Sequence, residues 1–158
     1  MAESIDMTTQ AKATPDVDLL GEFNFKVDGK GRVSIPAQFR DAFVGKTLVI
    51  ARELEDDCLY LFTESDYNAW VEQLFVDKFG GYNRANKTHV KLRGALKHRA
   101  RFVEIDGTGR IMVNADMRAA VGIEKDVVVA GNTGMVEIWA ADRYQAVDDE
   151  IDLSVFYN

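Results

Sequence analysis

The sequence contains two copies of one unit, and this repeat limits the folds that the chain can adopt. The segment from Phe25 to Arg40 aligns with the segment from Val103 to Arg118, 78 positions later. Similarity continues as far as Tyr67 in the first copy and Tyr144 in the second. A unit of about fifty residues buries little core alone. We therefore expect two copies fused into a pseudo-dimer that shares one barrel-like core.

Each copy has the pattern of two strands, a short helix, two further strands and a second helix. Apolar and polar residues alternate from Glu22 to Val27, as in a half-buried strand. The glycines that follow Asp28 supply a turn, a second strand starts at Arg32, and Pro36 suits the first helical position. Hairpins are expected at 47–52 with 58–62 and at 126–130 with 135–139. The pattern predicts an α+β fold of two tandem βαββα-type repeats with flanking helices.

Two helices are expected between the copies. The first begins after Thr63, a suitable N-cap, and the second runs from about Asn83 to Lys97. The first carries an apolar stripe at helical spacing, expected in the core or at a subunit contact: Tyr67, Trp70, Val71, Leu74 and Phe75. The expected divisions are a flexible tail at 1–18, a repeat at 19–70, a helical linker at 71–97, a repeat at 98–147 and an acidic tail at 148–158.

The formal net charge of −7 argues against a nucleic-acid partner until its distribution is considered. Without residues 1–18 and 145–158, acidic and basic side chains are equal in number. From Arg84 to Arg101 there are seven Lys or Arg, two His and no acid. Local positive potential, and not the total charge, governs DNA affinity. This stretch is either an anion-binding surface or a solvated helix face.

The sequence offers no catalytic or metal-binding constellation. His89 and His98 lack the partner cysteines or the spacing of a zinc site. Cys58 lies in an apolar strand and is expected to be a buried structural thiol. The segment from Met1 to Asp18 is polar and acidic, so we do not expect it to be a signal peptide. The apolar runs are too short to cross a bilayer. We expect a cytoplasmic protein that is not an enzyme, with no catalytic residues, cofactor, metal or membrane partner.

The repeated Asp-Gly-x-Gly-Arg turn, at Asp28–Arg32 and Asp106–Arg110, is the most specific motif. A tight hairpin explains the Asp and the glycines, with the Arg in a structural ion pair. However, an Arg held beside a glycine turn can also fork to a phosphate or to a guanine edge. The spacing alone leaves these two roles open.

These residues resemble the MraZ family, within the broader AbrB-like group. The resemblance runs from about Leu20 to Val147 and rests on both Asp-Gly-x-Gly-Arg copies at their separation. The later Glu137-Ile-Trp139 also matches, whereas Thr108 replaces the basic residue of the first turn and Asn114 replaces a Pro.

The resemblance implies an interlocked swapped-hairpin β-barrel and ring-shaped homo-oligomers. It implies repression of the family's own division and cell-wall gene cluster through short direct promoter repeats, and thus a nucleoid-associated protein. The family's DNA-binding motif falls on these positions: Asp28, Lys30, Arg32, Asp106 and Arg110. In this interpretation each Arg contacts double-stranded DNA, each Asp fixes its turn, and Lys30 adds a phosphate contact. The operator sequence, the number of subunits and the direction of regulation stay open.

An AbrB-like antitoxin or another partner-binding module is the alternative. Its hairpins would bind protein, and the acidic segment from Asp148 to Asn158, with its interspersed apolar residues, could be a toxin-binding tail.

Overall fold

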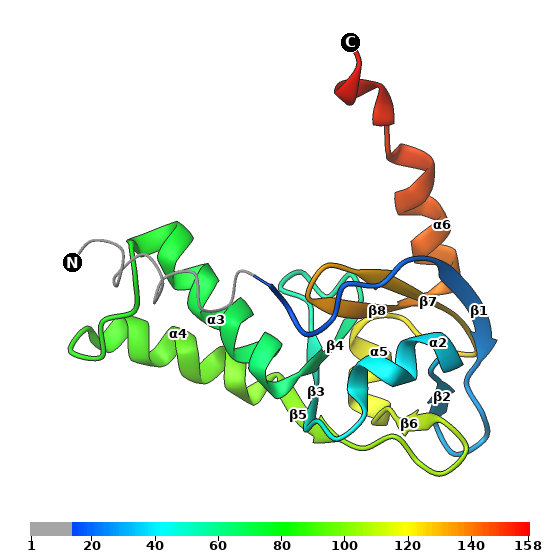
Figure 1. The fold of residues 1–158 in the computed structure, drawn as a ribbon. Coiled ribbons are helices and arrows are strands. Elements are labelled where there is room, and N and C mark those ends of the chain that lie inside the picture. Colours follow the sequence, from blue (N-terminus) through cyan, green and yellow to red (C-terminus); the bar gives the residue numbers. More distant parts are fainter. Residues whose placement is uncertain (1–13) are drawn as a thin grey trace.

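The computed structural model describes residues 14–158, and it contains the two expected repeats in tandem (Figure 1). The first repeat comprises β1 (Glu22–Lys26), β2 (Arg32–Ser34), α2 (Ala37–Arg40), η1 (Asp41–Phe43), β3 (Leu48–Arg52), β4 (Leu59–Thr63) and α3 (Glu64–Phe79). The helix α4 (Lys87–His98) follows. The second repeat comprises β5 (Ala100–Val103), β6 (Arg110–Met112), α5 (Ala115–Ala120), β7 (Asp126–Asn132), β8 (Met135–Ala140) and α6 (Ala141–Glu150), and η2 (Leu153–Phe156) ends the chain.

The two repeats exchange their first hairpins. In the large sheet, β1 pairs with β7 of the other repeat, and β5 pairs with β3. In the small sheet, β2 pairs with β6. The register is symmetric about the pairs Val33↔Ile111 and Tyr60↔Glu137, each of which joins equivalent positions of the two repeats. The chain is therefore a pseudo-dimer with interlocked hairpins.

The expected closed barrel is not formed. The large sheet has the open order β1-β7-β8-β4-β3-β5, and the β2–β6 ladder is a separate two-stranded sheet. After each edge strand, β1 or β5, the chain leaves the large sheet and forms β2 or β6. These two strands then pair with each other by backbone hydrogen bonds. The core is thus enclosed by two sheets and the short helices α2 and α5, without one continuous ladder.

A single apolar core lies between the sheets and draws on both repeats. Val33 and Ile111 face each other at its centre, and neither has any exposed surface. Leu59 and Ile138, which pair across the middle of the large sheet, are equally buried. Because each half contributes only part of this cluster, neither repeat can enclose a core alone.

The residues that precede β1 are packed on the body, although the sequence assigns them to a flexible tail. Val17 is fully buried in the core. The Asp66 carboxylate accepts hydrogen bonds from the backbone N–H groups of Asp16 (3.0 Å) and Val17 (2.9 Å). The packed part of the chain therefore begins before the expected boundary at residue 19, and residues 1–13 of the expected tail lie outside the described residues.

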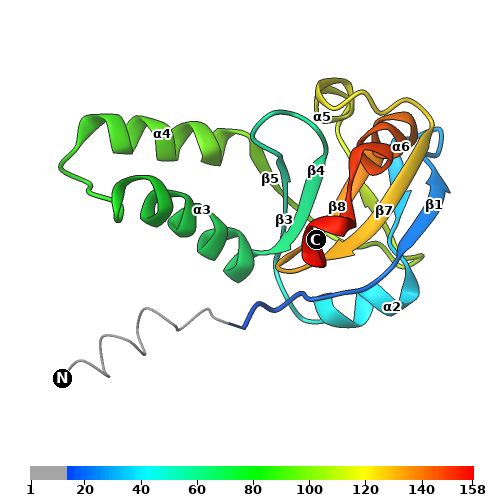
Figure 2. The ribbon, with the colours of Figure 1, turned by 90° about the horizontal axis from the view of Figure 1, so that it is seen from above.

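The helices α3 and α4 form an antiparallel hairpin that projects from one side of the sheet (Figures 1 and 2). Thr63 is the N-cap of α3, as predicted, and accepts from the Asp66 N–H at 3.1 Å. The helix α4 begins at Lys87, four residues later than expected. The reason is local: Asn86 caps it by accepting from the N–H groups of Thr88 and His89.

The stripe on α3 is mostly core, with Tyr67, Val71 and Phe75 buried against β3 and β4. Cys58 is also buried, beside Trp139. None of the helices formed by residues 14–158 combines the length and the apolar composition needed to span a bilayer.

Candidate nucleic-acid interface

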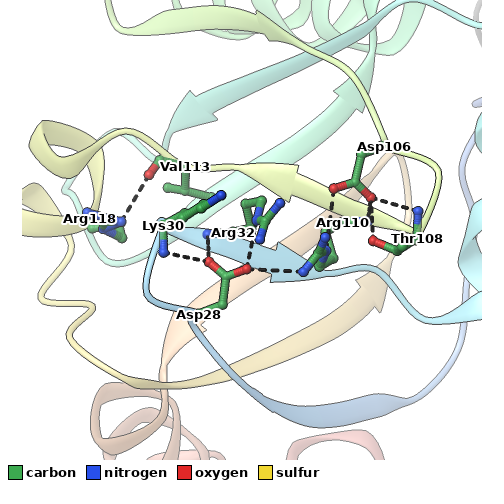
Figure 3. Close-up of polar contacts among 8 residues, drawn as sticks. All are labelled: Asp28, Lys30, Arg32, Asp106, Thr108, Arg110, Val113 and Arg118. Atoms are coloured by element: carbon green, nitrogen blue, oxygen red, sulfur yellow. Dashed lines mark hydrogen bonds and ion pairs between the residues drawn. The ribbon is translucent and has the colours of Figure 1, made fainter.

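The β2–β6 ladder brings the two Asp-Gly-x-Gly-Arg motifs together. Arg32 opens β2 opposite Met112, and Arg110 opens β6 opposite Ser34. The two arginines therefore lie on one small sheet although they are 78 positions apart in sequence (Figure 3). All five residues predicted as DNA-binding lie on these two hairpins, and their exact partners decide what each can do.

In the first hairpin, Asp28 organises the turn. Its Oδ1 accepts from the backbone N–H groups of Lys30 and Arg32, both at 2.9 Å. Its Oδ2 accepts from the Arg32 Nε at 2.7 Å. The Lys30 side chain remains exposed at the tip. A single carboxylate thus closes the turn and orients the Arg that follows it.

The second hairpin repeats this arrangement. The Asp106 Oδ1 accepts from the N–H groups of Thr108 (2.9 Å) and Arg110 (3.0 Å), and also from the Thr108 hydroxyl at 2.8 Å. The Arg110 Nε lies 3.4 Å from the Asp106 Oδ2. Thr108 therefore stabilises the turn, and it does more than replace the basic residue of the first hairpin.

The two arginines differ in how firmly they are held. The Arg110 Nη1 also donates to the Asp28 Oδ2 at 3.2 Å, so Arg110 joins the two hairpins. Within residues 14–158, the Arg32 guanidinium pairs with Asp28 only, through Nε. The forked edge of Arg32, formed by its terminal nitrogens, is thus left for a ligand. Both side chains are largely covered, with 27% of Arg32 and 28% of Arg110 exposed.

Hydrogen bonding keeps both carboxylates ionised. The backbone N–H of Arg32, followed by its side chain, lowers the pKa of Asp28 from 3.8 to about 2. The backbone N–H of Arg110 and the donors of Thr108 lower the pKa of Asp106 from 3.8 to about 2. At neutral pH each turn therefore carries a fixed negative charge that is matched by its Arg.

These pKa values predict how stability depends on pH. A carboxylate with a lowered pKa stabilises the folded state above its unfolded pKa, and this contribution is lost as the pH falls through the folded pKa. We expect the urea midpoint to fall between pH 4 and pH 2. The Asp28→Asn variant should be less stable than the wild type at pH 7 and should lose less stability over that interval. Urea unfolding at several pH values checks this, with the exposed Asp57→Asn as the control. An identical pH profile for Asp28→Asn and the wild type would contradict it.

Two further arginines belong to this site, and the sequence analysis missed them. Arg118 of α5 lies directly over Gly31, and its Nη1 donates to the Val113 carbonyl at 3.2 Å. Arg40, at the end of α2, lies in the same way over Gly109. The repeat itself held the signal, because Arg40 and Arg118 are aligned at its end. Each turn is therefore packed under an Arg from the other repeat.

Backbone hydrogen bonds complete this interlock. The Val113 N–H donates to the Gly31 carbonyl at 3.0 Å, and the Ile35 N–H donates to the Gly109 carbonyl at 2.9 Å. Both turn glycines have a positive φ, 85° for Gly31 and 82° for Gly109. A side chain at either position would be strained and would collide with the Arg above it. The two turns and the helix ends packed over them thus bring five bases together: Lys30, Arg32, Arg40, Arg110 and Arg118.

The basic stretch from Arg84 to Arg101 lies mainly on the helical hairpin, away from the β2–β6 ladder (Figure 1). Much of it has structural partners. Arg93 pairs with Glu72, Arg99 with Asp56, Arg101 with Asp116, and Lys97 bonds to Asn68. Arg84, Lys87 and Lys91 are exposed. For most of this stretch the charge is therefore accounted for by intramolecular contacts.

Among residues 14–158, no group of three or more His, Cys, Asp or Glu side chains is arranged to hold a metal ion. His89 is instead buried among aromatic rings, and its Nδ1 accepts from the Asn83 N–H at 3.0 Å.

Comparison with known proteins gives consistent matches over most of the chain. The family model described as "MraZ protein, putative antitoxin-like" matches residues 19–81 and 97–157. A protein of Lachnoclostridium phytofermentans named "Transcriptional regulator MraZ" is 32% identical over 127 residues, which cover 80% of this chain and 84% of that protein. A protein of the same name from Symbiobacterium thermophilum is 34% identical over 131 residues, covering 83% of this chain and 90% of that protein.

Proposed function

The chain belongs to the MraZ family of transcriptional regulators, and from this we propose that it binds promoter DNA through its two Asp-x-x-x-Arg hairpins. Membership also confirms the expectation that the chain is not an enzyme. In this proposal it acts as a ring-like homo-oligomer on short direct repeats and represses its own division and cell-wall gene cluster. Such a protein would be cytoplasmic and associated with the nucleoid.

The observation that carries this proposal is the convergence of Arg32 and Arg110 on one ladder, with Lys30, Arg40 and Arg118 on the same two turns and over them. A two-stranded ribbon fits the major groove of DNA. The forked edge of Arg32 suits a guanine edge or a phosphate, and Lys30 at the tip suits a phosphate. Asp28 and Asp106 act as positioning residues, because each closes its turn and forms an ion pair with the Arg that follows.

A single pair of hairpins offers few contacts, so oligomerisation supplies the rest. Subunits held in one assembly present their hairpins at a high effective concentration, provided that the spacing of the DNA repeats matches that of the subunits. Repeat spacing then becomes part of the specificity. The experiment that tests the function measures binding to the chain's own upstream region by footprinting and gel shift. Protection of short direct repeats, lost when their spacing is changed by half a helical turn, is the expected result. Equal binding to a shuffled fragment would contradict it.

Salt dependence separates the ladder from the helical hairpin as the source of DNA affinity. Each neutralised phosphate contributes about −0.9 to the slope of log affinity against log salt. If α4 touches DNA, Lys87→Gln with Lys91→Gln should flatten the slope by up to about 2 per engaged subunit and leave the sequence preference intact. Because these residues lie away from the ladder, we expect parallel lines for this variant and a flatter line for Lys30→Gln. Salt titrations of fluorescence anisotropy on one operator check this. Lys97 is left unchanged because it packs on the Tyr67 ring.

A further inference from the structure

The two hairpins of the ladder carry unequal charge. From position 26 to position 32, the first hairpin has three bases and one acid: Lys26, Lys30 and Arg32 with Asp28. The aligned positions of the second hairpin, from 104 to 110, have one base and two acids: Arg110 with Glu104 and Asp106. Arg110 is already paired with both Asp28 and Asp106. The second hairpin by itself therefore has no uncommitted positive charge to offer to a DNA backbone.

Arg40 brings a positive charge to this second turn from the other repeat. Its guanidinium packs on the bare backbone of Gly109, where an added Cβ would lie 2.5 Å from the Arg40 Cζ and 2.9 Å from its Nε. Gly109 stands between Thr108, which replaces the basic residue of the first turn, and Arg110. Arg40 also lines an open hollow of about 570 Å³. The charge that the second turn lacks in its own sequence is thus placed beside it in space.

The Arg40 side chain has no partner within the described part of the chain. No hydrogen bond or ion pair holds it among residues 14–158, and its Nε is buried without an acceptor. The aligned Arg118 differs, because its Nη1 donates to the Val113 carbonyl at 3.2 Å. Partly burying a cation without an acceptor costs free energy, and an anion at its terminal nitrogens offsets that cost. Arg118 therefore completes a contact inside the chain, whereas Arg40 is left for a ligand.

We propose that Arg40 binds a DNA phosphate beside the second turn and supplies there the positive charge that Lys30 supplies at the first. A guanidinium suits this ligand, because its donors match the oxygens of a phosphate in a fork. The inference rests on the proposed DNA binding through the hairpins, and it adds a residue that lies outside both of them. The phosphate contact of the second turn then comes from the first repeat, so the second repeat has no complete DNA-binding site of its own.

The dependence of DNA affinity on salt tests this role. Arg40→Gln should flatten the slope of log affinity against log salt by about 0.9 per engaged subunit and leave the sequence preference nearly intact. Arg118→Gln is the matched control at the aligned position. It should keep the wild-type slope and lower the melting temperature, since its partner is the Val113 carbonyl. Salt titrations of fluorescence anisotropy on the upstream region measure the slopes, and circular dichroism establishes folding. A wild-type slope for folded Arg40→Gln would overturn the proposal.

A lysine in the second turn should replace Arg40. The turn accommodates Thr108→Lys, because Lys30 occupies the same place in the first turn. This single variant leaves Arg40 untouched and should steepen the slope by about 0.9 per engaged subunit. Combined with Arg40→Gln, it should restore the wild-type slope. Thr88→Lys adds the same charge at an exposed position of α4, away from the ladder, and should restore nothing. An unchanged slope for Thr108→Lys, or equal restoration by Thr88→Lys, would overturn the proposal.

A further variant separates this inference from the proposed function. If Arg32→Ala with Arg110→Ala abolishes binding while Arg40→Gln keeps the wild-type slope, only the role of Arg40 is overturned. If that double variant binds like the wild type, the hairpins are not the DNA-binding surface, and both proposals fall.

Discussion

The R32A/R110A double variant is expected to bind the operator at least about 100-fold more weakly than the wild type. Each Arg that forks to a base contributes about 1–3 kcal/mol of discrimination, and 1.4 kcal/mol corresponds to tenfold in affinity. Two such losses in each engaged subunit multiply across an oligomer. Gel shifts on the upstream region measure the effect. Unchanged affinity in a folded double variant would show that these two residues do not contact DNA and act only in the turns.

The single variants should be unequal. Among residues 14–158, Arg32 pairs with one carboxylate and leaves its forked edge to a ligand, whereas Arg110 pairs with both Asp28 and Asp106. We expect Arg32→Ala to lower affinity more, and Arg110→Ala to lower the melting temperature more, because the hairpins lose their link. Arg84→Ala is the matched control, since it removes the same charge from an exposed position between α3 and α4, away from the ladder. A larger affinity loss for Arg110→Ala would reverse this assignment.

The turn glycines should give the second large effect, this time on folding. Gly31→Ala places a side chain in left-handed backbone, which costs about 1–2 kcal/mol, and displaces Arg118, whose hydrogen bond to Val113 is worth about 1 kcal/mol. We expect a loss of about 2–3 kcal/mol, or several degrees in melting temperature for a chain of this size. Gly109→Ala should behave similarly, because its added methyl group meets Arg40.

The same turns supply the control. Gly29 and Gly107 stand two positions earlier, where an added Cβ has no neighbour within 4 Å among the described residues. Alanine at either position should shift the melting temperature by no more than about 1–2 °C, since exposed substitutions usually change stability by less than about 0.5 kcal/mol. Thermal unfolding of the four variants side by side is sufficient. Equal losses at Gly29 and Gly31 would show that the arginines above the turns do not matter for stability.

Local pattern predicted the elements of this chain well, because the same pattern occurs twice. The order of strands and helices in each repeat, the cap at Thr63 and the burial of Cys58 all follow from spacing and residue type. The start of α4 was misplaced because Asn86, and not Asn83, provides the cap. Both residues are good caps, but the Asn83 side chain accepts from the Ala85 N–H in the preceding loop, and its backbone N–H donates to His89.

Local sequence pattern does not predict the contacts between the two repeats. The exchange of hairpins pairs β1 with β7 and β3 with β5, and no local pattern specifies a partner that distant. The family resemblance implied the exchange of hairpins, but it did not imply that the large sheet stays open. Arg40 and Arg118 were overlooked because each acts on a glycine of the other repeat. The sequence predicts a tail around Val17 because the neighbouring residues are polar. It does not indicate that the distant Asp66 carboxylate accepts hydrogen bonds from this part of the backbone.

The unequal halves of this pseudo-dimer have a consequence for orientation. A true two-fold dimer presents one hairpin twice and therefore fits a palindromic site. Here Lys30 stands where the other turn has Thr108, and Arg110 has a carboxylate partner more than Arg32. In the proposed function, the reading surface therefore has a polarity, and so must the base pairs beneath it. In the proposed ring-like oligomer, subunits related by rotation would keep that polarity all the way around. An inverted operator copy would offer the right base pairs to the wrong half of each subunit.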